Sequence, residues 1–266
     1  MKKISYDLFP DGKRKALTLS YDDATVDDRK MVEILNQYGI KGTFHLNSGW
    51  LDLEGRVTAA EVRSLYAGHE VAAHTVSHPY LPYIPVEQRV NEIMQDRQAL
   101  EKLVGYPVKG MSYPFGEVTD EVAKLLPQLG IDYCRTVHSQ RDFTMPEHFH
   151  RWHPTCHHLE NLLEFTEQFL QLNRPGKPLL FYVWGHSFEF ARDDNWDLLV
   201  QFCEQVGGRD EIWYATNKQI FDYVQALKRL EVSVDGSMIY NPSAMPVWFS
   251  VDGDPVKVDG GQLLQL

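Results

Sequence analysis

Cysteine, long apolar runs and positive charge are all scarce in this sequence of 266 residues. The three cysteines, Cys134, Cys156 and Cys203, lie far apart and form no Cys-x-x-Cys pair, which argues against a disulfide framework or a cysteine-based zinc site. No run is long enough to cross a bilayer, and no apolar signal-peptide core follows Lys2 and Lys3. We therefore expect a cytoplasmic protein.

Acidic residues outnumber basic residues by 37 to 26, so the formal net charge is −11 at pH 7. This excess of negative charge argues against nucleic acid or an anionic membrane surface as a partner. Hydrophobic residues make up 43% of the chain, which is enough for a sizeable core. The length fits one large α/β domain, or one domain with a small appendage, and carries no signal for an oligomeric state.

Strand-like apolar runs alternate with amphipathic stretches, which predicts βαβ units and a parallel sheet. Strands are predicted at residues 16–21, 42–47, 70–74, 109–114, 131–137, 177–186 and 212–216. Helices are predicted at residues 28–39, 59–67, 86–104, 119–129, 158–172, 193–206 and 217–229. Seven such units fit an open sheet or a barrel. After about residue 230, short alternating runs separated by Asp-Gly turns predict a small antiparallel extension over 231–266.

Two adjacent carboxylates, Asp22 and Asp23, end the first predicted strand in the run SYDDATVDD. Like charges repel unless something compensates them, so a bound cation is one reading and a solvated turn is the other. A cation held by one carboxylate would leave the other free to act as a base. Asp27 and Asp28 fit the start of the following helix, where acidic residues are favourable, and lie outside the predicted site.

Histidines also end predicted strands. His74 and His78 are four residues apart, a spacing that would place both imidazoles on one face of a helical turn. His186 ends a later strand in the run WGH, and the run SYPFG ends another. Because parallel strands present their carboxyl ends at one edge, these groups are expected to meet there. Two histidines and one aspartate would form a facial metal site with open positions; unrelated surface histidines are the alternative.

The runs SYDDA, HTVSH, SYPFG and WGH, in this order, resemble the motifs of the polysaccharide deacetylases (carbohydrate esterase family four, the chitooligosaccharide deacetylase homology domain) over roughly residues 15–230. The resemblance implies a catalytic distorted (β/α)7 barrel over 1–230, followed by the small β-hairpin extension. It implies removal of the N-acetyl group from an N-acetylated sugar or oligosaccharide by a hydrolase that uses a divalent metal, Zn²⁺ first, with Co²⁺, Ni²⁺ or Fe²⁺ as alternatives. The roles it implies are a general base Asp22, metal ligands Asp23, His74 and His78, a general acid His186, and an oxyanion contact from the Phe115 N–H.

The sequence departs from the family pattern at several positions. Ala24 stands where the family has glycine, and Ser112 replaces the arginine that braces the base. Arg135 and Arg151 are the candidates to take over that arginine's role, and its absence is the third alternative. The family's aspartate that tunes the acid histidine has no clear counterpart, and Asp142 is the one candidate. The alternatives are another C–N hydrolase of the same fold acting on cyclic amides or imides, and a carbohydrate-binding homologue without activity. A non-haem iron oxygenase would use the same ligands but leave Asp22 without a role.

Substrate contacts are expected from residues that stand beside the motifs, namely Trp50, Tyr113, Arg135, Trp152 and Trp184. The run HFHRWHPTCHH holds five histidines over 148–158. It predicts a loop at the mouth of the site or a surface cluster, with a second metal site as the less favoured reading. His157 and His158 are expected to begin a helix.

Overall fold

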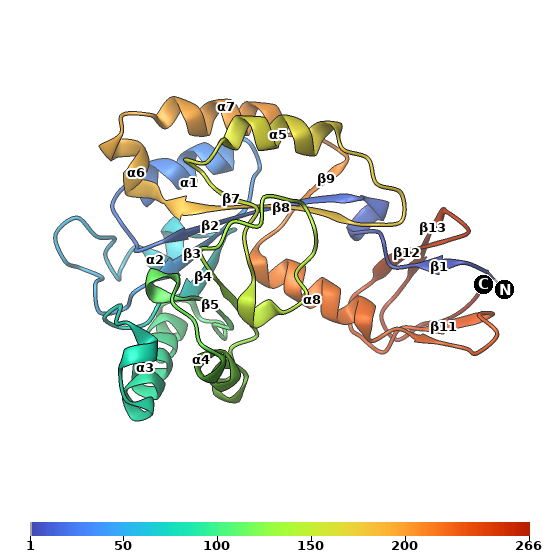
Figure 1. Ribbon diagram of the computed structural model, residues 1–266, viewed down its shortest axis with the longest axis horizontal. Coiled ribbons are helices and arrows are strands. Elements are labelled where there is room, and N and C mark those ends of the chain that lie inside the picture. The colour runs from blue at the N-terminus through green and yellow to red at the C-terminus, as the bar shows by residue number, and fades with distance from the viewer. Residues whose placement is uncertain (1) are drawn as a thin grey trace.

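A curled sheet of parallel strands forms the centre of the protein, whose computed structural model describes residues 2–266 (Figure 1). Within that range, the seven strands of the curl are β2 (Lys15–Asp22), β3 (Gly42–Leu46), β4 (Glu70–Ala73), β5 (Gly110–Ser112), β6 (Tyr133–Arg135), β7 (Cys156–His157) and β8 (Leu179–His186). Their order is β6-β5-β4-β3-β2-β8-β7, and a bridge between Arg135 and Trp152 joins the β6 edge to the segment that leads into β7. The predicted distorted barrel is therefore confirmed as a curled half-barrel.

Helices cover the outside of the sheet, with α1, α5, α6 and α7 grouped on one side in Figure 1. The α-helices are α1 (Asp28–Gln37), α2 (Val62–Leu65), α3 (Val86–Val104), α4 (Asp120–Leu125), α5 (Leu162–Gln171), α6 (Ser187–Arg192), α7 (Trp196–Val206) and α8 (Asn217–Lys228). Short 3-10 helices are η1 (Pro10–Gly12), η2 (Leu81–Tyr83), η3 (Pro114–Gly116), η4 (Leu126–Leu129) and η5 (Phe149–Arg151). None of the helices within residues 2–266 combines the length and apolar character needed to cross a membrane.

The seventh strand of the curl is not the one predicted. Strand β9 (Ile212–Tyr214) pairs alongside the first half of β2, as an eighth strand of the sheet. The seventh place belongs to β7, where Cys156 pairs with Val183 of β8. The prediction that His157 and His158 begin a helix is therefore wrong, because α5 starts only at Leu162. A strand of two residues is too short to leave a periodic signal in the sequence.

Alternation along the strands decides which side chains face the inside of the curl. Along β2, Leu17 packs in one hydrophobic cluster, whereas Ala16 packs in the other, together with Leu180 of β8. Because successive side chains point to opposite faces, Asp22 shares the face of Ala16, and His186 shares the face of Leu180. The two motifs therefore end their strands with reactive groups on the same face of the sheet.

Two small antiparallel sheets lie at the end of the molecule that carries both termini (Figure 1). Their strands are β1 (Ile4–Ser5), β10 (Glu231–Val232), β11 (Met238–Tyr240), β12 (Val247–Val251), β13 (Asp254–Val258) and β14 (Leu263–Gln265). Asp252 and Gly253 join β12 to β13 with positive φ at both residues, as a two-residue Asp-Gly hairpin requires. Since β1 pairs with β12, the first residues of the chain pack with the last ones. A domain boundary at residue 230 stays a prediction.

Candidate active site

A cleft of about 490 Å³ opens at the carboxyl edge of the parallel strands. It is lined by residues from every motif of the sequence, namely Asp22, Asp23, His74, His78, Tyr113, Phe115, Gly116, Val137, Trp184 and His186. Asp22 and His186 are register partners in the parallel pairing of β2 with β8. Backbone pairing therefore fixes the spacing of these two groups before any side-chain contact is made.

Asp22 is a buried carboxylate with a buried cationic partner. Its Oδ2 accepts a hydrogen bond from Nη2 of Arg135, which is itself fully buried on β6. The hydroxyl of Ser112 donates to Oδ1 over 3.2 Å. Burial opposes ionisation, but the Arg135 guanidinium outweighs it and holds the pKa of Asp22 well below its usual range. Asp22 is therefore an ionised group with fixed orientation.

Asp23 lies where the chain leaves β2. Both Asp23 and Ala24 have positive φ, 84° and 50°, and the Asp23 N–H donates to the carbonyl of His45 over 3.0 Å. This left-handed turn separates the two carboxylates, and the alanine occupies it without being glycine. Burial, followed by the neighbouring Asp22 charge, raises the pKa of Asp23. Its Oδ1 is buried and finds no hydrogen-bond partner anywhere in residues 2–266.

His74 and His78 converge through a loop and not through a helical turn. Thr75 and His78 have φ of 69° and 58°, which excludes the regular helix that the spacing suggested. The amide of Asn47 holds this loop, because Nδ2 donates to the carbonyls of His74 and Thr75 over 2.6 and 3.0 Å. The two imidazole centroids are 4.6 Å apart.

Asp23, His74 and His78 each offer a ligand atom, and these atoms lie within 4.8 Å of one another. The His74 Nδ1–H donates to the Ser112 carbonyl over 2.9 Å, which leaves Nε2 as a lone pair 3.7 Å from Asp23 Oδ1. Burial lowers the pKa of His74 to about 3, so the ring is neutral. Burial also lowers the pKa of His78. Two imidazoles with lowered pKa, one of them oriented by a backbone carbonyl, beside a buried carboxylate oxygen without a partner, fit a divalent transition metal.

Glu189 is a functional candidate that sequence reasoning missed. Its Oε2 accepts from the backbone N–H of His186 over 3.0 Å and from its Nδ1 over 3.2 Å. His157 Nε2 contacts the same oxygen at 3.0 Å. Burial lowers the pKa of His186. The hydrogen bond to Glu189 and the nearby carboxylates outweigh burial and raise that pKa above its ordinary value. The available signal was the position of Glu189 three residues after His186, at the start of α6.

The start of α6 is also anchored on its other side. Ser187 Oγ donates to Asp28 Oδ1 over 2.5 Å and lies 2.7 Å from the Thr25 hydroxyl. Burial raises the pKa of Asp28 to about 7. Asp28 therefore begins α1, as predicted, and in addition fixes the residue that follows His186.

The run SYPFG builds one wall of the cleft. Phe115 has a φ of 59° and stacks on Tyr80 with ring centroids 3.7 Å apart, while its ring also lies 4.4 Å from that of His78. Gly116 has a φ of 71°, and a Cβ there would lie 2.1 Å from a methyl group of Val137. Both the backbone conformation and the close approach therefore require glycine at the end of this motif.

The predicted arginine and carboxylate alternatives can now be separated. Arg135 reaches Asp22, whereas Arg151 pairs with Asp120 at the surface. The prediction that Asp142 tunes His186 is wrong, because Asp142 accepts hydrogen bonds from Thr144 in its own turn.

Of the residues predicted to contact substrate, some lie at the cleft and others are buried away from it. Trp184 and Tyr113 line the cleft, although the Tyr113 hydroxyl already donates to the His150 carbonyl over 2.8 Å. Trp50 lies beside the cleft, with its ring centroid 5.3 Å from that of His78. Trp152 is 1% exposed and packs in the core, so the prediction that it contacts substrate does not hold. Arg135 is fully buried and bonds to Asp22, so the prediction that it contacts substrate does not hold either.

The histidine-rich run 148–158 does not form one cluster. His158 is fully buried, stacked on Phe190 at 4.1 Å, so a surface location is wrong for it. Ligand atoms of His157, His158 and Glu189 lie within 4.8 Å of one another. However, the Leu159 N–H donates to His157 Nδ1 over 3.2 Å, which places the proton of a neutral ring on Nε2, facing Glu189. A protonated nitrogen cannot bind a metal, so His157 and Glu189 fit a hydrogen-bonded pair better than a metal site.

Comparison with known proteins agrees with the motif order. Residues 10–134 match the family model described as polysaccharide deacetylase. This segment, just under half of the chain, resembles a polysaccharide deacetylase domain. Deacetylases of this family are hydrolases, and the matched segment holds Asp22, Asp23, His74, His78 and Phe115, whereas His186 lies beyond it.

Relatives of the polysaccharide deacetylase domain include fungal and bacterial enzymes. The chitin deacetylase of Colletotrichum lindemuthianum is 28% identical over 102 residues, which are 37% of this chain and 41% of that protein. The peptidoglycan-N-acetylglucosamine deacetylase of Bacillus cereus is 25% identical over 126 residues, 47% of this chain and 45% of that protein. The chain therefore aligns with less than half the length of these two relatives.

Solved structures show the same fold over a longer part of the chain. The Xyl-CE4 domain of a multidomain xylanase from the hindgut metagenome of Trinervitermes trinervoides superposes with a TM-score of 0.55 at 19% identity, over 80% of this chain and 92% of that domain. A family 4 carbohydrate esterase from Streptomyces lividans gives 0.53 at 15% identity, over 76% and 93%. The polysaccharide deacetylase fold thus extends past the segment matched in sequence.

Proposed function

We propose that this protein is a metal-dependent hydrolase that removes the N-acetyl group from an N-acetylated sugar or oligosaccharide. The observation that carries the proposal is the convergence of Asp23, His74 and His78 beside a second, ionised carboxylate, Asp22. Relatives named as chitin and peptidoglycan-N-acetylglucosamine deacetylases support the choice of substrate class. Phe115 lines the cleft with an exposed ring, backed by Tyr80, and such a ring suits contact with a sugar ring.

Asp23, His74 and His78 would hold the metal. A divalent ion bound there supplies a Lewis acid for the acetamide carbonyl and lowers the pKa of a water molecule. The chain's own contribution is to keep both imidazoles neutral and to orient His74 through the Ser112 carbonyl.

Asp22 would act as the general base. It accepts one proton from the water as the water oxygen attacks the carbonyl carbon of the N-acetyl group. Arg135 keeps the carboxylate ionised and fixes its orientation, while Ser112 holds the second oxygen. The Phe115 N–H, in a turn with positive φ beside His78, would donate to the developing oxyanion. One such donor contributes about 3 kcal/mol to stabilisation of the transition state.

His186 would act as the general acid. Glu189 holds its Nδ1, so Nε2 is left for the cleft and can give its proton to the sugar nitrogen as the C–N bond breaks. The products are acetate and a free amine. Protonation is needed because an amide nitrogen is too poor a leaving group to depart as an anion.

The test is acetate release from N-acetylated chitooligosaccharides by the purified protein, with and without a chelator. Asp23→Asn should abolish release, whereas the matched control Asp27→Asn, a carboxylate four residues along the same segment, should retain it. Release that continues unchanged in Asp23→Asn or after chelation would contradict the metal-dependent mechanism. Hydrolysis of a cyclic amide or imide, with none of the sugar, would contradict the proposed substrate.

A further inference from the structure

A second cavity, of about 410 Å³, lies at the opposite end of the parallel strands from the catalytic cleft. Its lining comes from the chain before β2, from the start of β8, from the second half of α8 and from two loops: Tyr6, Leu8, Phe9, Thr144, Met145, Arg174, Lys177, Pro178, Leu179, Val224, Leu227 and Lys228. Strand β8 begins at Leu179 in this cavity and ends at His186 in the cleft. At about 3.3 Å per residue, the two ends lie about 23 Å apart, so the cavity is separate from the deacetylase site.

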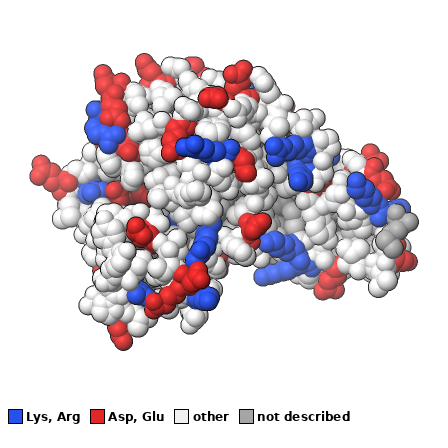
Figure 2. Space-filling model, viewed as in Figure 1, with Lys and Arg blue, Asp and Glu red and all other residues white. Residues whose placement is uncertain are grey.

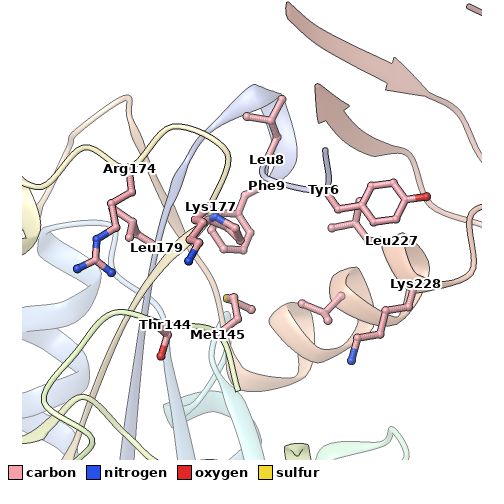
Figure 3. Close-up of a pocket in the computed structure, with 12 residues that line it drawn as sticks. Tyr6, Leu8, Phe9, Thr144, Met145, Arg174, Lys177, Leu179, Leu227 and Lys228 are labelled. Carbon is pink, nitrogen blue, oxygen red and sulfur yellow. The ribbon is translucent and has the colours of Figure 1, made fainter. Parts of the chain in front are cut away.

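The floor of the cavity is apolar. Leu8, Phe9 and Leu179 are buried and Leu227 is nearly so, while Met145 and Val224 are half-buried at its sides. Figure 3 shows the Phe9 ring and the Met145 side chain facing the space between the β-strands and α8. A volume of this size lies within the range of small-molecule sites in proteins, which is about 300–1,000 Å³.

The rim of the cavity is cationic. Arg174, Lys177 and Lys228 line it, all three are exposed, and no ion pair to any of them is formed by residues 2–266. In Figure 3, Lys177 and Lys228 lie on opposite sides of the apolar floor. Figure 2 shows basic side chains on both sides of a hollow at this junction of the barrel with the C-terminal strands. None of the described lining residues is acidic, although the whole chain carries a net charge of −11.

We propose that this cavity binds an anionic amphiphile, a molecule with an apolar chain or ring and one carboxylate or phosphate headgroup. The apolar part would occupy the floor formed by Phe9, Leu179 and Leu227. The headgroup would lie at the rim, where Arg174, Lys177 and Lys228 supply unpaired positive charge. Three cations without acidic partners, beside an apolar cavity in an acidic protein, are the charge complement of such a ligand.

The size of the cavity favours one free small molecule over a membrane surface. A membrane would contact a flat or convex cationic patch, whereas here the apolar side chains lie recessed between Lys177 and Lys228. The negative charge of the rest of the chain would also oppose approach to an anionic bilayer.

The experiment is isothermal titration of the full chain with octanoate, octyl phosphate, octanol and octylamine. We expect saturable one-to-one binding of octanoate or octyl phosphate, with octanol at least tenfold weaker and no binding of octylamine. The double variant R174E/K177E should weaken anion binding at least tenfold. The matched control K102E/K124E makes the same charge change on α3 and α4 and should leave binding unchanged. Val224→Trp, which fills the cavity, should weaken all ligands together.

Several results would overturn the proposal. One is the absence of saturable binding by both anions; another is binding that neither R174E/K177E nor Val224→Trp alters. Association with phosphatidylglycerol vesicles, lost in R174E/K177E and unaccompanied by octanoate or octyl phosphate binding, would assign the cations to a membrane surface instead. A dimer seen by sedimentation that Val224→Trp dissociates would assign the cavity to a second copy of the chain. If octanoate binds and octyl phosphate does not, or the reverse, the headgroup is identified.

Discussion

The two ends of the parallel strands carry two unlike cavities. At the carboxyl end, the buried Asp22 carboxylate is paired with Arg135, and five residues around the cleft hold left-handed backbone: Asp23, Ala24, Thr75, His78 and Phe115. At the amino end, none of the described residues that line the cavity has positive φ, and the charges are exposed and unpaired. Each non-glycine residue with left-handed backbone costs about 1–3 kcal/mol in conformational energy, which the surrounding fold must offset. The comparison indicates that, of the residues lining the two cavities, those with left-handed backbone lie around the catalytic cleft.

The largest expected effect comes from Asp22→Asn, which should lower catalysis at the cleft without changing ligand binding at the distant cavity. Loss of the general base should lower kcat by about 10³-fold, within the range for acid–base groups. Arg135 would keep its fully buried position but lose a charged partner, so a fall in Tm is also expected. Octanoate affinity at the distant cavity should stay unchanged. Retention of more than a tenth of wild-type kcat would show that Asp22 is not the base.

A smaller effect, of about 10- to 100-fold in kcat near pH 8, should follow from Glu189→Gln. Glu189 raises the pKa of His186, so its loss should lower that pKa and remove the protonated acid at high pH. The alkaline limb of the pH–rate profile should therefore move to lower pH. The midpoint of the His186 ring titration, followed by NMR, should move to lower pH as well. Glu164→Gln, on the exposed face of α5, is the control. An unshifted profile in Glu189→Gln would mean that Glu189 only supports the fold.

Gly185→Ala should affect stability more than chemistry. A Cβ at residue 185 would lie 2.0 Å from His158 Nδ1, so the buried imidazole would have to move. Overpacking of this kind costs about 1–3 kcal/mol in free energy of unfolding. The double variant Gly185→Ala with His158→Ala should recover part of that loss, since the alanine would then have room. Equal stability of wild type and Gly185→Ala in urea unfolding would contradict the packing described.

The smallest effect on acetate release should come from R174E/K177E. Because the two cavities share a strand but no side chains, kcat/KM should stay within about twofold of wild type, while anion binding at the cavity is lost. A large change in kcat/KM would mean that the two ends are coupled through the sheet, and the comparison would need revision.

Much of the framework was predictable from the sequence. The ends of β2 and β8 were placed correctly, and α3 has the predicted bounds, because long apolar or amphipathic runs carry a strong periodic signal. By contrast, the two-residue strand β7 left no pattern.

Within the site, the identity of the reactive residue types was predictable, while their supporting contacts were not. Arg135 braces Asp22 from β6, the strand next to the motif that lost its arginine, where it is the register partner of Ser112. The curl of the sheet brings β6 close enough to β2 for this contact. Glu189 was not predicted, because the family resemblance implies an aspartate and not a glutamate three residues after the acid histidine. The geometry of His74 and His78 depends on left-handed residues, which the spacing of four does not encode.

The most direct test of the account is calorimetric titration of Zn²⁺ into the chelator-treated protein. We predict one ion per chain for the wild type and none for Asp23→Asn, with Asp27→Asn unchanged. Failure of the wild type to bind, or equal binding by Asp23→Asn, would contradict the claim that Asp23, His74 and His78 share a metal ion.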